Sequence, residues 1–256
     1  MKVTVCELND EPGAFQRDWE RLISHVKTES SHVVLLPEMP FYRWFGGTSV
    51  FDVAVWQAAV TAHEQWQRRL SELAPAIVLG SQPVNKGDQR LNEGFVWEQE
   101  NGYSGVHEKY YVPDEEGAWE ASWYSRGRGD FTPMQTRVGC IGFAICTELW
   151  AMGQMWLYGK QGVHVIATPR LTIKATRDKW LAGGRVAAIV SGAYSISSNR
   201  VSSSDGANDF GGQGWIIGPD GEVLGLTSKE SPFITREISL MEAEHAKQTY
   251  PRYSLD

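Results

Sequence analysis

The sequence predicts an α/β protein in which helices cover the outside of β-sheets. Short apolar or alternating runs bounded by Gly, Pro, Asn or Asp are typical of strands, and longer segments carry apolar residues at helical spacing. Strands and helices alternate in the first half of the chain, whereas the last strands follow one another through turns such as Pro219-Asp220-Gly221. No linker, low-complexity segment or repeat interrupts the pattern, so we expect one domain over residues 1–256.

Each element is predicted from its own stretch of sequence. The strands are expected at residues 2–8, 32–36, 76–81, 94–98, 104–107, 137–145, 163–167, 193–198, 214–217, 222–226 and 233–238. The helices are expected at residues 14–29, 51–73, 148–160 and 174–190, with a shorter one at 240–247. In the second helix Val53, Trp56, Val60, Ala62 and Trp66 recur roughly at helical spacing, which predicts one apolar face.

Composition excludes several classes of protein. The 256 residues include 24 Lys and Arg against 31 Asp and Glu, a net charge of −7, whereas a nucleic-acid binder should show a basic stripe. No window approaches the roughly 18 consecutive apolar residues of a membrane helix. The first ten residues turn acidic too early for a signal peptide, and three cysteines cannot form a disulfide framework. We therefore expect a cytoplasmic protein with neither a membrane nor a nucleic-acid partner.

The stretch that ends in Cys146 carries the strongest sign of chemistry. An apolar strand runs directly into Cys146, and a helix is expected to begin at Thr147 and Glu148. A thiol that faces a helix N-terminus gains thiolate character, and the thiolate is the nucleophile. The alternative is a small buried apolar residue, since free cysteines are among the most buried residues. For Cys6 and Cys140, which lie inside strand runs, that alternative is favoured.

Glu38 follows the apolar run Val33-Val34-Leu35-Leu36-Pro37. It therefore lies just beyond the C-terminal end of a buried strand, where open α/β sheets place their ligand sites. A carboxylate in such surroundings suits a general base. The alternative is an ordinary loop glutamate with its head group in water.

Lys109 follows another short strand, and Glu120 comes eleven residues later. A lysine brought into a pocket beside a thiol would lower the pKa of that thiol and stabilise an oxyanion. The alternative is a solvated lysine in an acidic loop.

In this order, the three stretches resemble the nitrilase superfamily of carbon–nitrogen hydrolases. The matching residues are Leu36-Pro37-Glu38, then Glu108-Lys109 with Val112-Pro113-Asp114, Gly117, Trp119 and Glu120, then Ile145-Cys146, and last the closing hairpin from Gly211 to Leu224. The resemblance extends from Lys2 to about Tyr253. The chain departs from the pattern at Gly214, where many relatives carry serine, and at Val190-Ser191, where a Glu-Asn pair is usual.

The resemblance implies a fold and a mechanism. The fold would be a four-layer α-β-β-α sandwich. Cys146 would attack a small amide to form a thioester, with Glu38 as general base. Lys109 and the backbone N–H of Thr147 would hold the oxyanion, and Glu120 would fix the lysine. This chemistry requires no metal and no other cofactor.

Other activities remain open at this stage. Nitrile hydrolysis is less favoured because nitrilases usually carry tryptophan directly after the nucleophile, where this chain has Thr147. Transfer of the acyl group to an amine or alcohol would use the same residues. A Cys-His thiol hydrolase would pair Cys146 with His107 or His164, and a fourth possibility is a scaffold without activity.

Substrate recognition is predicted from aromatic and basic residues near these positions. Trp44, Trp119 and Trp123 are candidate pocket residues, each with core packing as its alternative. Arg170, which follows the strand after the nucleophile's helix, would bind a substrate carboxylate, unless it is a surface arginine. The number of aromatic residues favours an apolar or aromatic acyl group.

The resemblance also implies a homodimer. Relatives pair through the helices next to the nucleophile, and their C-terminal tail crosses to the partner. We expect residues 240–256 to form such a tail, because its aromatic stretch at residues 248–253 suits an ordered contact.

Overall fold

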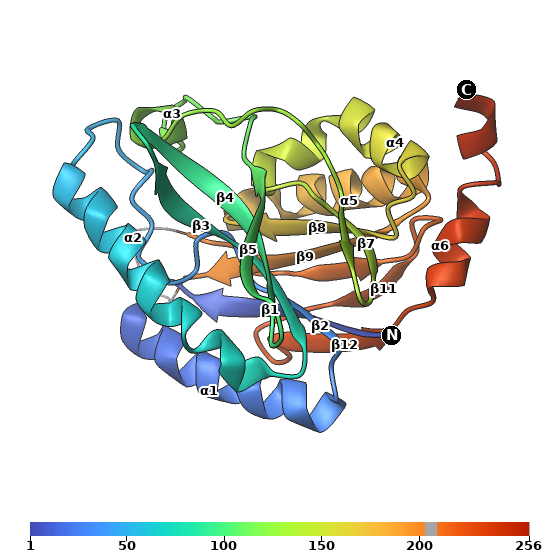
Figure 1. Ribbon diagram of the computed structural model, residues 1–256, viewed down its shortest axis with the longest axis horizontal. Coiled ribbons are helices and arrows are strands. Elements are labelled where there is room, and N and C mark those ends of the chain that lie inside the picture. The colour runs from blue at the N-terminus through green and yellow to red at the C-terminus, as the bar shows by residue number, and fades with distance from the viewer. Residues whose placement is uncertain (203–208, 256) are drawn as a thin grey trace.

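Two β-sheets pack face to face with helices on their outer faces in the computed structural model, which describes residues 1–202 and 209–255 (Figure 1). The α-helices are α1 (Pro12–Glu29), α2 (Val53–Gln67), α3 (Glu120–Trp123), α4 (Met152–Lys160), α5 (Arg177–Ser191) and α6 (Leu240–Ala246). Short 3₁₀ helices are η1 (Leu70–Leu73), η2 (Cys146–Trp150), η3 (Lys174–Thr176) and η4 (Arg252–Leu255). The strands are β1 (Lys2–Asn9), β2 (Val33–Leu35), β3 (Ile77–Lys86), β4 (Gln89–Glu98), β5 (Gly102–Glu108), β6 (Met134–Thr136), β7 (Gly139–Phe143), β8 (Val165–Arg170), β9 (Tyr194–Val201), β10 (Trp215–Ile217), β11 (Val223–Leu226) and β12 (Phe233–Glu237).

The two sheets are joined through β1. The first sheet has the order β5-β4-β3-β2-β1-β12, and the second has the order β6-β7-β8-β9-β10-β11. The first half of β1 pairs with β2 and β12, whereas Glu7, Leu8 and Asn9 pair in parallel with β9. The central pairs β1–β2, β2–β3, β7–β8 and β8–β9 are all parallel. The carboxyl ends of β2 and β7 are therefore available to one site.

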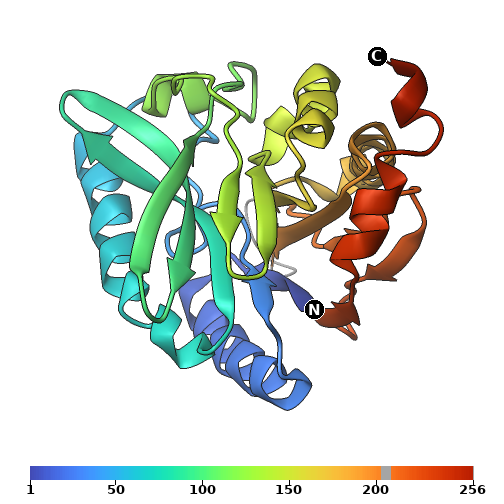
Figure 2. The same ribbon diagram turned by 45° about the vertical axis from the view of Figure 1, so that its right-hand side comes forward.

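Burial on both faces explains why these strands are continuously apolar. In β2, Val33 and Leu35 pack between the sheets, while Val34 packs toward α1. Helices α4 and α5 cover the second sheet in the same way (Figure 2). The structure therefore confirms the four-layer α-β-β-α arrangement. No helix in residues 1–202 or 209–255 has the length and apolarity needed to cross a membrane.

Helix α1 shows how the layers are held together. Phe15, Trp19, Leu22 and Val26 recur every three or four residues and are buried against the first sheet. The Glu11 side chain caps the start of the helix, and Ser30 ends it in the left-handed conformation with φ of 54°.

Every predicted helix and strand overlaps an observed one, but several predictions are wrong in extent. Within the strand expected at 137–145 only β7 is a strand, because residues 137–138 form the turn between β6 and β7 and residues 144–145 follow β7. The strands expected at 76–81 and 94–98 correspond to the longer β3 and β4, which pair as a hairpin. The helix expected at 51–73 ends at Gln67 and continues only as η1 before Pro75. The helix expected at 148–160 is divided into η2 and α4 at Ala151, whose ψ of 69° is not helical.

The close approach of β9 to the start of β10 explains Gly214. An ideal Cβ at this position would lie 2.6 Å from the backbone oxygen of Ser197, which cannot move without disturbing β9. Because any side chain would overlap this oxygen, the serine found in many relatives has no room here.

We expect Gly214→Ala to lower the free energy of unfolding by about 1–3 kcal/mol, measured by urea denaturation. Gly47→Ala is the matched control, because a Cβ at Gly47 meets no atom within 4 Å. Equal urea midpoints for the two variants would contradict this account of Gly214.

Candidate active site

The predicted catalytic residues meet at one edge of the two sheets. Glu38 follows β2, Lys109 follows β5, and Cys146 follows β7. The backbone N–H of Lys109 donates to the carbonyl of Asn92 at 2.9 Å, which extends the β4–β5 pairing by one residue. The fold thus brings together three segments that are far apart in sequence.

Lys109 is buried between two carboxylates. Its Nζ donates to Oε1 of Glu38 at 2.8 Å and to Oε2 of Glu120 at 2.5 Å. Lys109 and Glu38 are fully buried, and Glu120 is 5% exposed. An unpaired charge at this depth would be strongly destabilising, so the three side chains depend on one another.

Burial and mutual charge determine the pKa values in this cluster. Desolvation by itself would lower the pKa of Lys109, but Glu120 and Glu38 raise it well above its ordinary value. Desolvation raises the pKa of Glu120 to about 7, with the Lys109 charge opposing the rise. Tyr124 donates its hydroxyl to Oε2 of Glu120. The lysine is therefore a permanent cation, while Glu120 titrates near neutrality.

Cys146 occupies a tight turn at the end of β7. Its φ is 49°, in the left-handed region that residues with a side chain seldom adopt. The Sγ atom lies 3.8 Å from the carbonyl oxygen of Leu171.

The expectation that a helix N-terminus makes Cys146 a thiolate is wrong for the resting protein. Burial raises the pKa of the Cys146 thiol well above its ordinary value, and the charge of Glu38 adds to this rise while Lys109 opposes it. The element that begins at Cys146 is a 3₁₀ helix of five residues, too short for a substantial dipole. The thiol is therefore protonated at rest and requires a proton acceptor.

Glu38 has one oxygen free for such a task. Oε1 accepts hydrogen bonds from Lys109 and from Nδ2 of Asn92, the latter at 2.8 Å. Oε2 is buried and has no hydrogen-bond partner in the described structure. Among the nearby charges, that of the Glu38 carboxylate has the largest effect on the pKa of the Cys146 thiol, which it raises.

Arg200 holds the loop that carries Glu38. Its buried guanidinium donates to the carbonyls of Glu38, Met39 and Tyr42, and forms an ion pair with Asp10. Sequence reasoning gave no role to Arg200, because it lies in β9 and reaches the Glu38 loop only where β9 pairs with the end of β1.

Glu148 ties the Cys146 turn to the Lys109 strand. Its carboxylate accepts from the backbone N–H groups of Ile145 at 2.8 Å and Tyr110 at 2.7 Å, and contacts Nε2 of His107 at 2.7 Å. This buried acid thus fixes the backbone on both sides of the site.

The two histidines considered as partners for Cys146 are held elsewhere. His107 contacts Glu148, while His164 accepts from the backbone N–H of Cys140 at 3.0 Å and contacts Glu244 at 2.6 Å. Neither is placed for a Cys-His pair. No three His, Cys, Asp or Glu side chains of the described chain are grouped as metal ligands would be.

A cavity of about 440 Å³ opens onto Cys146 and Glu120. Its other lining residues are Trp44, Pro113, Glu115, Glu116, Gly117, Ala118, Thr147, Leu171, Thr172, Ile173, Thr176, Trp180, Asp209 and Phe210. Trp44 was predicted as a pocket residue, whereas Trp180 and Phe210 were missed because their segments follow the nucleophile's helix at a distance in sequence.

Three predicted substrate contacts lie elsewhere. Trp123 is 2% exposed, packs against α2 and donates its Nε1 to the carbonyl of Thr48. Trp119 is half-buried and is not among the residues that line the cavity.

The structure contradicts the carboxylate-binding role expected of Arg170. Its guanidinium is buried and donates to Ser197, Thr172 and the carbonyl of Gln213 at 2.7–2.8 Å. It also lies 4.0 Å from the ring centre of Trp215. Three of its five N–H groups are thus used inside the protein, and Arg170, which is 1% exposed, is not among the residues that line the cavity.

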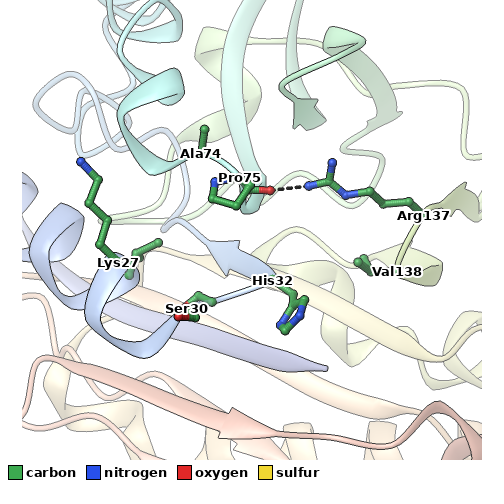
Figure 3. A pocket seen from close by; sticks show the side chains of 9 residues that line it. Lys27, Ser30, His32, Ala74, Pro75, Arg137 and Val138 are labelled. Carbon is green, nitrogen blue, oxygen red and sulfur yellow. Dashed lines mark hydrogen bonds between the residues drawn. The ribbon is translucent and has the colours of Figure 1, made fainter.

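A second cavity, of about 470 Å³, lies at the opposite ends of the parallel strands (Figure 3). It is formed by the end of α1 and the residues that precede β2, β3 and β7. The guanidinium of Arg137 points across it to the carbonyl of Pro75. Parallel sheets place their ligand sites at the carboxyl ends of strands, and no cysteine or carboxylate lines this cavity. We therefore take the cavity beside Cys146 as the candidate active site.

Comparison with known proteins identifies the class to which this fold and site belong. The family model described as Carbon-nitrogen hydrolase matches residues 3–248, so the chain belongs to that family. The fold is similar to that of a carbon-nitrogen hydrolase from Helicobacter pylori G27. The two structures give a TM-score of 0.87 and 20% identity, over 99% of this chain and 94% of that one. Nit3 of Saccharomyces cerevisiae, a member of branch 10 of the nitrilase superfamily, gives a TM-score of 0.78 and 18% identity over 98% and 94%.

Among curated proteins, the chain is similar to a chloroplastic omega-amidase of Arabidopsis thaliana. The two are 25% identical over 254 residues, which is 91% of this chain and 68% of the relative.

Glu120 should make the stability of the fold depend on pH. Because its pKa is raised from 4.5 to about 7, the folded chain binds this proton more tightly than the unfolded chain does. The resulting stabilisation is complete below about pH 4.5 and is lost as the pH rises to about 7. The glutamine of Glu120→Gln does not titrate, so this variant serves as the reference. As the pH rises from about 4.5 to about 7, the free energy of unfolding of the wild type should fall by roughly 3 kcal/mol relative to that of the variant. If urea titrations show the same difference in unfolding free energy between wild type and Glu120→Gln at every pH in this range, the raised pKa of Glu120 is contradicted.

Proposed function

We propose that this protein hydrolyses the carbon–nitrogen bond of a small amide through a thioester on Cys146. One observation carries the proposal: Oε2 of Glu38, whose charge raises the pKa of the Cys146 thiol, is buried without a hydrogen-bond partner in the described structure, while Oε1 is held by Lys109. Amide hydrolysis requires a nucleophile, a reversible proton acceptor and a cation for the oxyanion, and these three side chains supply them. The resemblance to an omega-amidase supports an amide as substrate.

In the first half of the reaction, Oε2 of Glu38 accepts the thiol proton as Sγ attacks the carbonyl carbon of the amide. The C=O π electrons move to oxygen, and the resulting oxyanion is stabilised by Nζ of Lys109 and the backbone N–H of Thr147. Each such donor lowers the barrier by about 3 kcal/mol in a dry site. Lys109 remains charged throughout because Glu120 and Glu38 raise its pKa.

In the second half, Glu38 returns the proton to the leaving nitrogen, so that ammonia departs and the thioester remains. Glu38 then accepts a proton from water, which attacks the thioester carbonyl. Collapse of this second intermediate breaks the C–S bond and releases the carboxylic acid, while Glu38 returns its proton to the departing sulfur and restores the thiol. Nitrile hydrolysis and acyl transfer would begin on the same residues, and the products distinguish them.

Ammonia release from ω-amides, N-carbamoyl acids, simple aromatic amides and nitriles tests the proposal. We expect turnover of at least one amide, and a loss of at least about 10³-fold in kcat for Cys146→Ala. Cys140→Ala, which removes another buried thiol, is the matched control and should retain activity. Mass spectrometry should find the acyl group on the peptide that contains Cys146.

Glu38→Gln and Lys109→Met should be as impaired as Cys146→Ala, because each removes an essential group from the same cluster. An active Lys109→Met variant combined with an inactive His107→Ala or His164→Ala variant would instead support a Cys-His enzyme.

We further propose a homodimer in the cytoplasm. The end of η2, the helices α4 and α5 and the C-terminal tail expose large apolar side chains, and the tail lies on the side of the molecule away from α1 and α2 (Figure 2). These side chains are Trp150, Leu157, Val186, Tyr250 and Tyr253, between 39% and 73% exposed. An apolar patch of this kind favours association with a second copy. The three free, buried cysteines suit a reducing compartment.

Light scattering at micromolar concentration should therefore give twice the chain mass of 28.6 kDa. A double variant, Leu157→Glu with Val186→Glu, should shift the protein to the monomer mass, because it buries charge in the expected interface. Val53→Glu, a control at a 62% exposed position on α2, should remain dimeric. A wild-type protein of monomer mass would refute the dimer.

A further inference from the structure

The cavity that contains Cys146 has an acidic lining. Glu115 and Glu116 come from the loop before α3, and Asp209 comes from the segment before β10. All three carboxylates are exposed, and none forms an ion pair with a described residue. No lysine, arginine or histidine of the described chain lines this cavity.

Several cations lie near this cavity, but none of those in the described chain lines it. Lys109 is already paired with Glu38 and Glu120. Arg126 lines a neighbouring groove that shares Glu115 with the cavity.

Two further cations approach the cavity from behind its lining. Lys174 donates its backbone N–H to the carbonyl of Asp209 at 2.9 Å, and Arg170 lies 5.7 Å from the ring centre of Trp180. Every charged side chain among the described residues that line the cavity is nevertheless acidic.

Aromatic side chains form the walls between these carboxylates and the nucleophile. Trp44, Trp180 and Phe210 line the cavity, and Trp180 and Phe210 are less than 10% exposed. Aromatic faces attract cations by about 0.5–2 kcal/mol, whereas they offer nothing to a carboxylate. Walls of this kind suit a hydrocarbon chain that ends in a positive charge.

Two observations independent of the acidic lining make this cavity a ligand site. It reaches the nucleophile Cys146, and the buried Oε2 of Glu38 in the same cluster has no partner in the described chain. Its volume of about 440 Å³ lies in the range typical of small-molecule sites.

We propose that the acyl part of the substrate carries a cationic amine, which Glu115, Glu116 and Asp209 recognise, and that amides with a carboxylate tail are disfavoured. This inference deepens the proposed function and rests on it, since it concerns the same cavity. It also corrects the expectation of a carboxylate-binding arginine, because Arg170 is enclosed by Ser197, Thr172 and Gln213.

Three amides of similar length test the charge preference. 5-Aminopentanamide carries a terminal ammonium, hexanamide replaces it by a methyl group, and glutaric acid monoamide ends in a carboxylate. We expect kcat/KM to fall in that order, with at least about a tenfold advantage of the cation over the neutral amide, equivalent to about 1.4 kcal/mol. Added salt should reduce the ratio of kcat/KM for the cationic amide over the neutral amide, because the three carboxylates are exposed and salt screens their charges.

The triple variant Glu115→Gln, Glu116→Gln, Asp209→Asn should bring the ratio of kcat/KM for 5-aminopentanamide over hexanamide close to one. Asp114→Asn is the matched control: Asp114 lies in the same loop but lines the neighbouring groove instead of the cavity. It should leave most of the ratio intact. A triple variant that keeps the wild-type ratio would overturn the assignment of these carboxylates.

Binding separates a failure of this inference from a failure of the proposed hydrolysis. Calorimetry with Cys146→Ala should show tighter binding of 5-aminopentanamide than of glutaric acid monoamide, whatever the turnover of the wild type. Equal binding, no binding of the cationic amide, or tighter binding of the carboxylate would overturn the charge preference while leaving amide hydrolysis intact. Absence of ammonia release from every amide, with the cationic amide still bound selectively, would overturn only the hydrolysis.

Discussion

The burial of Lys109 is the constraint on which the rest of the site depends. An ammonium group without access to water is tolerable only if its hydrogen bonds go to charged acceptors, and Glu38 and Glu120 provide them at 2.8 and 2.5 Å. One acceptor follows a strand and the other begins the helix α3, so two elements must be held against the end of β5. Asn92, Tyr124 and Arg200 do this by fixing the side chains or the loop of those acceptors. Much of the polar structure in this region therefore supports one cation.

The same burial explains why the thiol needs Glu38. A cysteine exposed at the start of a long helix would ionise more readily, but Cys146 is 3% exposed and lies close to two carboxylates. Desolvation therefore keeps the proton on sulfur until a substrate carbonyl is available to accept the electron pair. The turn that presents the thiol adopts a φ of 49°, and Glu148 holds that turn by accepting the N–H of Ile145. The proposed mechanism therefore depends on proton transfer within the cluster and not on a permanently activated thiolate.

The surroundings of the cavity follow from how the two sheets are joined. Because β1 pairs in parallel with β2 in one sheet and with β9 in the other, the C-terminal ends of β2 and β9 lie at the same edge of the sandwich. Arg200 crosses this junction and ties β9 to the Glu38 loop. The loop before α3 and the segment before β10 then complete the cavity with carboxylates, while Trp180 and Phe210 supply its walls. In the proposed function, loops would therefore select the substrate, and the ends of the strands would carry the reacting groups.

The sequence alone was sufficient for the layered α/β fold and for the grouping of Glu38, Lys109, Glu120 and Cys146. The packing of helices outside sheets follows from local apolar patterns. The grouping of the four residues is what the resemblance of short motifs in a fixed order to the nitrilase superfamily implies. It did not indicate Asn92, Tyr124, Arg200 or Trp180, because a single sequence does not show which distant side chains will lie within hydrogen-bonding reach. It also suggested the wrong state for the thiol and the wrong task for Arg170. Both depend on desolvation, which the burial of a side chain determines, and burial arises only when the layers pack. Tertiary structure therefore decided the electrostatics of the site and the charge of its cavity.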